Sequence, residues 1–368
     1  MTQRPIIIGG GLAGGSAASR LASLGRAPLL FEREGGAHDK ICGEFLSVEA
    51  GRHLAALGFE VNRLGGARID TMRLHVGTRS ATARLPFVAT GVTRRALDSA
   101  LLDHAAGQGA DIQRGVGVRH IDDGQAVTTD GPAGLGPLLL ATGKHELRGQ
   151  TRNPSGTISD LIGFKQFFRA TPALRDALAG TVEVTTFDGG YAGLQPVENN
   201  RLNLCLLVDR DRFKAVGSSW PALFARLILE PGLAMLAEAE PLLDKPLTIS
   251  SVPYGYLARP RVDDAIWRLG DQAAVIPSFC GDGMAMALHS GRLAADMLAG
   301  GASPHAYQSR LRGDVARQVR LATTLQRLSS SRAGRFALIT GLTAIPAALA
   351  TLARWTRVES AAVARAGA

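Results

Sequence analysis

Cysteine and aromatic side chains are scarce in this 368-residue sequence, and their scarcity excludes several classes of function. The three cysteines, Cys42, Cys205 and Cys280, are too widely spaced for a zinc-binding pattern or a disulfide framework. Aromatic residues make up 5% of the chain, and no stretch interleaves them with basic residues as nucleic-acid-binding proteins do. The sequence also has no internal repeat, no catalytic triad, no metal-ligand cluster and no carboxylate pair. We therefore expect neither a hydrolase, nor a metal centre, nor a nucleic-acid partner.

Acidic residues are nearly missing from the C-terminal end. From Arg310 onward there are ten arginines and only two acidic residues, Asp314 and Glu359, so this tail carries +8 of the net charge of +9. Residues 336–353 within the tail are uncharged. The length of this segment is at the short limit for a membrane span, and Pro346 interrupts it. Two interpretations remain open: a helical hairpin packed on the core, or an interfacial segment attracted to anionic lipid.

A secretory signal is also missing, because an apolar strand is predicted as early as residues 6–8. Together with the few cysteines, this favours a cytoplasmic location, with peripheral membrane association through the tail as the open alternative. Apolar residues make up 46% of the sequence, enough for a sizeable core in two domains or one composite domain.

What the sequence does contain is a glycine-rich fingerprint at its start. The apolar strand at residues 6–8 is followed by Gly9, Gly11 and Gly14 and then by a predicted helix. These glycines permit a tight turn, close approach of a pyrophosphate, and close packing of helix on strand. A second strand at residues 28–31 ends in Glu32, near the spacing expected for an acid that binds ribose hydroxyls. The pattern predicts a site for FAD or NAD rather than NADP, whose 2′-phosphate Glu32 would repel.

Three further segments, together with the fingerprint, resemble one family. They are residues 40–47 (KICGEFLS), residues 94–98 (RRALD), and residues 270–271 (GD) with residues 281–283 (GDG). The set resembles the superfamily of p-hydroxybenzoate hydroxylase, a family of FAD-dependent oxidoreductases, and within it the geranylgeranyl reductase-related branch.

The resemblance implies FAD as cofactor, with Asp271 on the ribityl hydroxyls and Arg94 reaching the cofactor. The implied FAD-binding residues are Gly9, Gly11, Leu12, Ala13, Gly14, Glu32, Arg33, Lys40, Cys42, Gly43, Arg94, Gly270, Asp271, Pro277, Gly281, Asp282, Gly283 and Met284.

The order of predicted elements indicates a composite α/β fold. Strands and helices alternate up to about residue 155, residues 155–262 are rich in strands, and the second glycine segment then returns to the cofactor. We expect a discontinuous Rossmann-like FAD-binding domain from residues 1–65, 90–155 and 262–310. An antiparallel-sheet substrate domain is expected from residues 66–89 and 156–261, followed by a basic helical region, residues 311–368.

Two departures from the family pattern bear on the substrate. The strand near residue 140 ends in Ala-Thr-Gly-Lys rather than the Asp-Gly that many aromatic hydroxylases use for FAD and NAD(P)H. The reductases carry a Tyr-x-Trp-x-Phe-Pro strand, whereas residues 191–196 read YAGLQP. Less aromatic bulk opens the pocket, and an amide adds a hydrogen-bonding group. Tyr191, Gln195 and Pro196 are the predicted substrate residues, facing a wide hydrophobic ligand with polar atoms. The Trp-x-Trp-x-Ile-Pro segment of flavin halogenases is absent.

The candidates for catalysis are Cys42, Glu44 and His145, each with a structural alternative. Cys42 is either a redox or substrate contact or a small buried thiol. Glu44 is either a general acid or base beside the flavin or an acid at a helix N-terminus. His145 either moves protons or serves as a structural donor.

Three functions follow from these observations. The first is an FAD-dependent monooxygenase that uses NAD(P)H as transient reductant and O2 to hydroxylate a hydrophobic, phenolic or polyketide-derived molecule. The second is an FAD-dependent reductase of C=C bonds in a prenyl-lipid-like substrate. The third is a flavin-binding electron-transfer protein. The same fold hosts all three, and consumption of O2 separates the first from the second.

Overall fold

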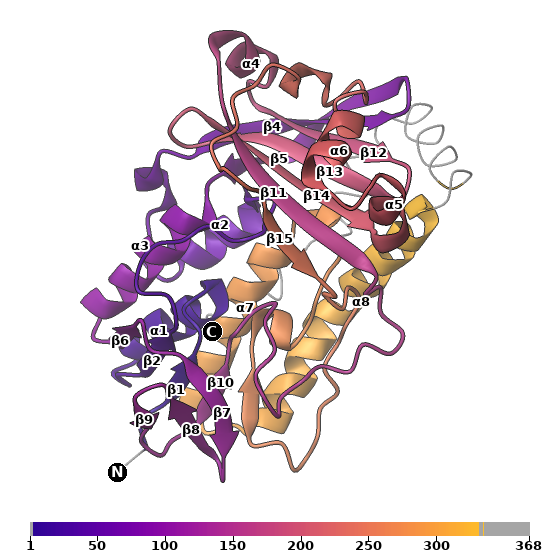
Figure 1. The fold of residues 1–368 in the computed structure, drawn as a ribbon. Helices are drawn as coiled ribbons and strands as arrows, with labels where there is room; N and C mark the ends of the chain where they lie inside the picture. Colours follow the sequence, from indigo (N-terminus) through magenta and orange to yellow (C-terminus); the bar gives the residue numbers. More distant parts are fainter. Residues whose placement is uncertain (1–2, 331–333, 335–368) are drawn as a thin grey trace.

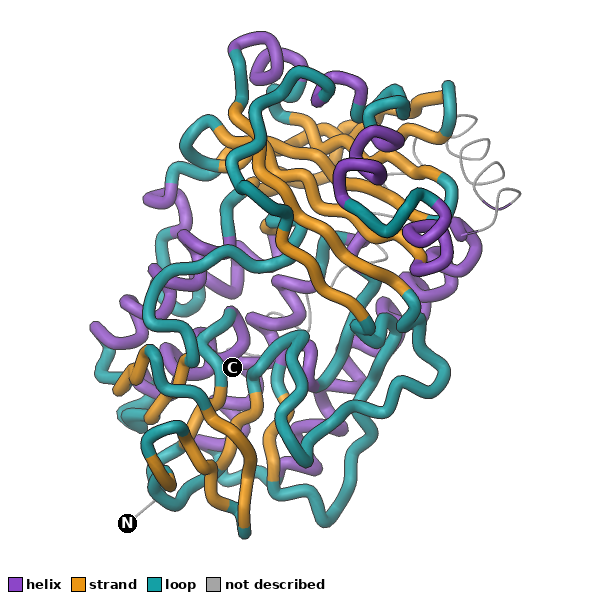
Figure 2. The backbone as a smooth tube through the Cα atoms, in the orientation of Figure 1, coloured by secondary structure: helices purple, strands orange, loops and turns teal. Residues whose placement is uncertain are grey.

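Two separate sheets organise the molecule, one at each end of Figure 1. The computed structural model describes residues 3–330 and residue 334 of the chain. The predicted composite α/β architecture is confirmed. Figure 2 shows the strands of the two sheets grouped apart, with helices and loops between them.

The first sheet is entirely parallel and has the order β16-β10-β1-β2-β6. Its central strand is the predicted apolar strand, and all three of its residues are buried, as expected for a parallel strand covered on both faces. The strands are β1 (Ile6–Ile8), β2 (Leu29–Glu32), β6 (Asp111–Arg114), β10 (Leu138–Leu140) and β16 (Ile266–Arg268). Because β16 comes 125 residues after β10 yet pairs with it, the chain leaves this layer and returns to it.

Helices cover the parallel sheet and join it to the rest of the molecule. They are α1 (Leu12–Ser23), α3 (Arg94–Gly107), α7 (Gly283–Ala299) and α8 (Pro304–Ser330). Gly291 allows α7 to approach α1 closely, since a Cβ there would overlap the carbonyl oxygen of Ala13. A small sheet of β7 (Val118–Asp122), β8 (Gln125–Thr128) and β9 (Gly131–Pro132) flanks this half.

The second sheet has eight strands in the order β15-β11-β14-β13-β12-β4-β5-β3, antiparallel except for the β12–β4 pair. Its strands are β3 (Phe45–Leu46), β4 (Ala67–Val76), β5 (Arg79–Gly91), β11 (Leu161–Arg169), β12 (Thr181–Phe187), β13 (Gly190–Val197), β14 (Arg201–Asp209) and β15 (Leu247–Ser250). The edge strand β3 comes from the stretch that the sequence assigns to the nucleotide-binding half. It therefore carries the chain directly from one half to the other.

Short helices lie in both halves. In the second half they are α4 (Pro172–Ala177), α5 (Arg210–Ala215) and α6 (Trp220–Leu227), with a 3-10 turn at Ala234–Leu236. Helix α2 (Val48–Ala55) and the 3-10 turns at Val61–Leu64, Gly270–Gln272 and Ser278–Cys280 belong to the nucleotide-binding half. One face of the sheet packs on α6 in an apolar cluster that includes Phe164, Phe168 and Leu194. The opposite face is turned toward the nucleotide-binding half.

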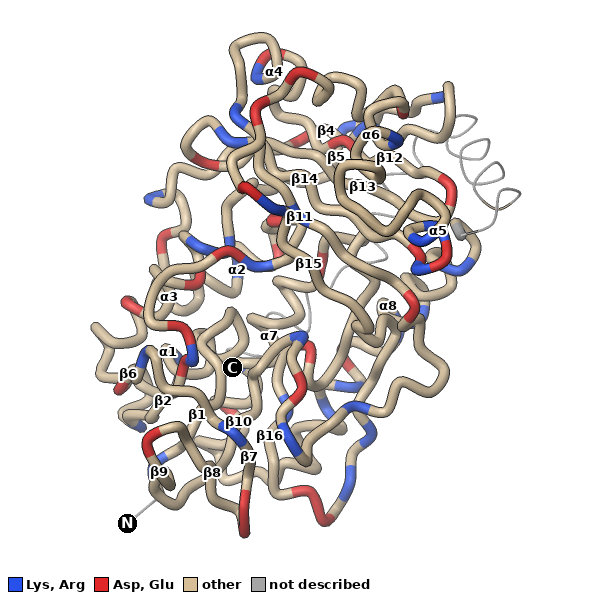
Figure 3. Tube along the Cα trace, in the orientation of Figure 1, with Lys and Arg blue, Asp and Glu red and all other residues tan. Residues whose placement is uncertain are grey.

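Most of the basic C-terminal region, residues 311–368, lies outside the part of the chain that the structure describes. Residues 336–353, for which a hairpin or an interfacial segment was predicted, lie outside the described residues. Among the described helices, none combines the length and the apolarity that crossing a membrane requires. Figure 3 shows basic and acidic positions interspersed over both halves in this view.

Candidate functional site

A large cavity lies between the two halves. Its volume is about 940 Å³, near the upper end of the range for small-molecule pockets. One end is formed by the glycine-rich turn after β1 and by the start of α7. The other end is formed by the inner face of the second sheet, including Leu74, Val182 and Val184, and by the end of α8. A ligand in this cavity would contact both halves.

The fingerprint glycines have the conformations and contacts that their roles require. Gly9 has a φ of 107°, and a Cβ there would come within 2.5 Å of the Ala141 carbonyl oxygen. A Cβ on Gly14 would overlap the carbonyl oxygen of Gly9, so helix α1 can pack on β1 only with glycine at this position. Gly11, Leu12 and Ala13 line the cavity.

Gly11 lies beneath two basic side chains. A Cβ at this residue would meet only Arg94 Nη2 at 3.3 Å and Lys40 Nζ at 3.8 Å. Gly11 is also the N-cap of α1, and no side chain caps the helix there. The backbone N–H groups of the first turn and two cations thus face one space, an arrangement that suits an anion such as a diphosphate.

Asp98 holds both of these cations. It accepts hydrogen bonds from Arg94 Nε at 2.7 Å, Arg94 Nη2 at 2.8 Å and Lys40 Nζ at 2.8 Å. Burial opposes ionisation of Asp98, but the two cations outweigh it and lower the pKa of its carboxyl. Of the two cations, Arg94 lines the cavity, whereas Lys40 borders the small depression beside it.

Glu32 is buried beside the turn rather than on the cavity wall. Its Oε2 accepts from the Gly10 N–H at 2.7 Å, and its Oε1 accepts from the Glu34 N–H at 3.0 Å. It borders a separate small depression with Gly10 and Lys40. This acid therefore holds the glycine turn in place. The adjacent Arg33 points away to His145, with Nη2 3.1 Å from the ring Nε2.

The second glycine segment meets the fingerprint across the cavity. Gly270, Asp271, Gly281, Gly283 and Met284 all line it. Gly270 and Gly281 have φ values of 55° and 66°, which favour glycine. The other two predicted residues of this segment are not on the wall: Pro277 precedes the 3-10 turn at Ser278–Cys280, and Asp282 is buried, accepting from Ser47 Oγ at 3.3 Å.

Residues 40–44, which carry the Cys-Gly-Glu motif, form a wall whose carbonyl groups are all held by side chains from elsewhere. Lys165 Nζ donates to the Lys40 carbonyl at 2.9 Å, and Lys144 Nζ donates to the Ile41 carbonyl at 2.8 Å. Asn203 Nδ2 donates to the carbonyls of Cys42 at 3.2 Å and Gly43 at 2.8 Å. Gln195 Nε2 donates to the Glu44 carbonyl at 2.9 Å. Three side chains of the second sheet, together with Lys144 from the loop after β10, thus hold a segment of the nucleotide-binding half in place.

Glu44 forms a buried ion pair at the end of this wall. Its side chain and that of Lys165 are 0% exposed, and Lys165 Nζ lies 2.5 Å from Glu44 Oε1. The same oxygen accepts from the Arg94 N–H at 2.8 Å, whereas Oε2 has no hydrogen-bond partner among the described residues. Glu44 also has a φ of 59°, unusual for a residue with a side chain.

Burial raises the pKa of Glu44 to about 7, against the opposing attraction of Lys165. A carboxyl with this pKa exchanges protons at neutral pH. Of the three catalytic candidates, Glu44 therefore has the clearest acid–base chemistry. It lines the cavity, and because its carboxylate accepts the backbone N–H of Arg94, the first residue of α3, it also lies at a helix N-terminus, the structural alternative predicted from the sequence.

The other two catalytic candidates differ in position. Cys42 lines the cavity, and its Sγ accepts from the Glu44 N–H at 3.3 Å. His145 is exposed beside Arg33 and is not part of the cavity wall, so the structure does not support a catalytic role for it. Its sequence position directly after a strand end was misleading, because the chain turns outward there.

The three predicted substrate residues fall on both faces of β13. Tyr191 and Gln195 line the cavity, as does Gly193 between them. Pro196 does not line it, because neighbouring side chains on a strand point to opposite faces. One donor of the Gln195 amide is used within the protein, because Nε2 donates to the Glu44 carbonyl, and its contact with a substrate hydroxyl stays a prediction.

Sequence reasoning missed several residues of the site. Lys165, Asn203 and Cys205 belong to β11 and β14, and Tyr254 and Ser278 to loops far along the chain. Burial raises the pKa of the Cys205 thiol to about 11, so it stays protonated. A lysine and an asparagine inside otherwise apolar strands (residues 161–169 and 201–209) were the available signal, since such residues are buried only with a partner.

No protein-family model matches the sequence. A curated menaquinone reductase of Mycolicibacterium smegmatis is 26% identical over 324 residues, which cover 80% of this chain and 76% of that protein.

Several solved structures have a similar fold. The myxobacterial chondrochloren halogenase, described as a variant of FAD-dependent halogenases, has a TM-score of 0.73 at 20% identity, covering 99% of this chain and 95% of its own. A flavoprotein/dehydrogenase of Cytophaga hutchinsonii has a TM-score of 0.74 at 18% identity, and the match covers 89% of this chain and 86% of that protein. Halogenase PltM in complex with phloroglucinol and FAD has a TM-score of 0.73 at 16% identity, covering 89% and 76%. The chain thus has the fold of these flavoproteins, while its place in the geranylgeranyl reductase-related branch stays a prediction.

Proposed function

We propose that this protein is an FAD-dependent oxidoreductase that reduces C=C bonds of a prenyl-lipid-like substrate. The observation that carries the proposal is the continuous cavity, which joins a cationic glycine-rich end to an aliphatic end. The similarity to a menaquinone reductase over 80% of the chain supports the reductase over the hydroxylase.

The residues present at the cationic end fit FAD. The space above Gly11, which a Cβ would fill, adjoins Arg94, Lys40 and the uncapped start of α1, and suits a diphosphate. Asp271 and the first turn of α7 lie on the same cavity and would hold the ribityl chain and the ring. FAD would supply the two-electron redox chemistry, with NAD(P)H as the proposed reductant.

The protein's own residues would position the substrate and manage the proton. The wall at residues 40–44 is held by five hydrogen bonds from side chains elsewhere in the fold, so it keeps its shape when a ligand enters. Glu44 would hold a proton near neutral pH and release it while Lys165 stabilises the remaining carboxylate. The apolar walls would exclude water.

The aliphatic end favours a long hydrocarbon chain. Met72, Leu74, Leu85, Val182 and Val184 line it from three adjacent strands, β4, β5 and β12. Aliphatic walls of this kind give non-directional stabilisation that grows with the apolar area of the ligand.

Monooxygenase activity remains the second candidate, favoured by one observation. Gly193 lines the cavity beside Tyr191, where the resembling reductases carry a large aromatic residue, so an aromatic substrate ring would have room there.

One experiment separates the two. Purified protein is loaded with FAD, supplied with NADH, NADPH or dithionite, and given a prenylated quinone with and without O2. The reductase saturates a double bond without O2, whereas the hydroxylase produces nothing unless O2 is present. Electron transfer alone would oxidise the reductant and leave the carbon skeleton of the quinone unchanged.

A further inference from the structure

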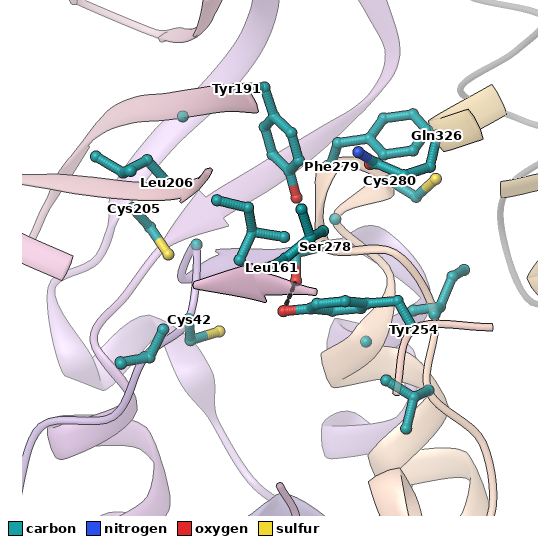
Figure 4. A pocket seen from close by; sticks show the side chains of 18 of the residues that line it. Cys42, Leu161, Tyr191, Cys205, Leu206, Tyr254, Ser278, Phe279, Cys280 and Gln326 are labelled. Atoms are coloured by element: carbon teal, nitrogen blue, oxygen red, sulfur yellow. Dashed lines mark hydrogen bonds between the residues drawn. The ribbon is translucent and has the colours of Figure 1, made fainter. Parts of the chain in front are cut away.

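Two tyrosine hydroxyls and one serine hydroxyl meet at one end of the cavity. Tyr191 belongs to β13, Tyr254 to the loop after β15, and Ser278 to the 3-10 turn before α7, and all three line the cavity. In Figure 4 the Tyr191 hydroxyl points toward Ser278, which is joined to Tyr254 by a dashed line. These three segments are far apart in the sequence, and the fold brings their hydroxyl groups together.

Tyr191 is well buried, and its hydroxyl is incompletely satisfied. The residue is 8% exposed, and its oxygen makes no hydrogen bond of good geometry with the described residues, although it lies close enough to Ser278 for that hydroxyl to oppose the rise in its pKa. Its ring packs edge-on against Phe279, with centroids 5.9 Å apart at 78°, so the ring direction is fixed. A buried hydroxyl with only this one poorly oriented neighbour is incompletely satisfied, which points to a further group that occupies the cavity when the protein is at work.

Tyr254 provides a second donor in the same place. Its hydroxyl oxygen accepts from Ser278 Oγ at 3.3 Å, so its own proton stays available to another acceptor. Burial raises the pKa of both tyrosines, so both remain neutral O–H donors at physiological pH. Among the charged groups, Lys144 opposes the rise in the pKa of Tyr254 and Asp271 adds to it.

We propose that Tyr191 and Tyr254 form a subsite for an acceptor-only oxygen, the carbonyl oxygen of a quinone or ketone head group. Two converging O–H donors match an oxygen that has lone pairs and no proton. This inference rests on the proposed function for the rest of the ligand, because the aliphatic walls of β4, β5 and β12 would take the attached chain. The inference adds that the substrate is amphiphilic and is held by hydrogen bonds to its quinone or ketone head group.

The test measures binding, not turnover. The probes are 1,4-naphthoquinone carrying one prenyl unit and the matching prenylnaphthalene, which has the same shape without oxygen atoms. Affinities are measured by calorimetry on the FAD-loaded protein and on the variants Tyr191→Phe and Tyr254→Phe. Each variant should bind the quinone about tenfold more weakly, the loss expected from one buried hydrogen bond, and bind the naphthalene as wild type does.

Tyr256→Phe is the matched control, because Tyr256 lies two residues from Tyr254 and is not part of the cavity wall. It should change neither affinity. A second readout is the carbonyl stretching band of carbon-13-labelled quinone, which a donor shifts on binding. The shift should shrink in both cavity variants and stay unchanged in Tyr256→Phe.

Equal losses for both probes would show that the tyrosines only shape the cavity, and would overturn the subsite. Unchanged quinone affinity and an unchanged carbonyl band would overturn it too, by showing that the hydroxyls are satisfied within the protein. If the subsite is confirmed but the loaded enzyme saturates no double bond, the proposed function fails and the subsite stands.

Discussion

The two ends of the cavity are built in different ways. At the nucleotide-binding end, polar and charged groups are paired: Arg94 and Lys40 share Asp98, and Glu32 accepts two backbone N–H groups. At the sheet end, the wall combines aliphatic side chains of β4, β5 and β12 with charged residues at positions 209–212, and it includes the hydroxyl of Tyr191. A site whose charged side chains are already held in place suits one fixed ligand, whereas an aliphatic wall discriminates mainly by the length and head group of the ligand.

The largest expected effect is at the nucleotide-binding end. Gly11→Val places a branched side chain in the space below Arg94 and Lys40, where the diphosphate would lie. FAD affinity should fall by more than about 100-fold, the equivalent of losing about 3 kcal/mol. Flavin fluorescence titration measures this, and circular dichroism should show that the fold persists. Gly313→Ala in α8 is the control: a Cβ there meets nothing within 4 Å, so FAD binding should not change. Unaltered FAD binding in Gly11→Val would place the cofactor elsewhere.

The junction of the two ends should show a pH signature. In the unfolded chain Glu44 ionises near the ordinary glutamate pKa of 4.5, whereas in the folded protein its pKa is about 7. The folded protein therefore binds more protons in this window, and the free energy of unfolding falls as pH rises from about 4.5 to 7, then levels. Between pH 5 and pH 8, the free energy of unfolding of the wild type should therefore fall by about 3 kcal/mol more than that of Glu44→Gln.

Urea unfolding at several pH values measures that difference. Glu49→Gln is a matched control, because Glu49 is also buried with an unpartnered Oε2 but is not part of the cavity wall. If the free energy of unfolding of wild type and of Glu44→Gln changes with pH in the same way, the raised pKa of Glu44 is contradicted, and Glu44 is not the proton-exchanging group.

At the aliphatic end, the effect should depend on the length of the substrate. Leu74→Trp enlarges a side chain on the wall formed by β4 and shortens the space for a hydrocarbon chain. The KM for a substrate with several prenyl units should rise about tenfold, as expected for about 1.4 kcal/mol of lost burial. A substrate with one prenyl unit should be affected less than about twofold. Equal effects on both substrates would show that the hydrocarbon chain of the substrate binds in another part of the cavity.

The smallest effect concerns Gln195. Gln195→Leu removes one donor to the Glu44 carbonyl, which keeps the hydrogen bond from the Val92 N–H at 3.1 Å. We expect the free energy of unfolding to fall by about 1 kcal/mol, with no preference against oxygenated substrates. A selective loss for oxygenated substrates would show that this amide does contact the ligand, as the sequence alone predicts.

The sequence predicted the nucleotide-binding end better than the sheet end, for a physical reason. Gly9, Gly11 and Gly14 act within one strand–turn–helix unit, where spacing alone determines geometry. Lys165, Asn203 and Tyr254 reach the site through long-range strand pairing, which no local pattern reveals. Gln195 shows the same limit, because strand alternation placed it on the cavity face but did not identify its partner on residues 40–44. His145 shows the opposite error, since a position next to a motif was interpreted as a position in the site.

The central claim is that one cavity holds FAD and a prenyl-lipid-like substrate for reduction of a C=C bond. Its most direct test is strictly anaerobic turnover of a prenylated quinone by the FAD-loaded protein with a chemical reductant, followed by mass spectrometry. The account predicts a product that has gained two hydrogen atoms in its prenyl chain, formed at the same rate without O2. A product that has gained one oxygen atom, formed only when O2 is admitted, would contradict it.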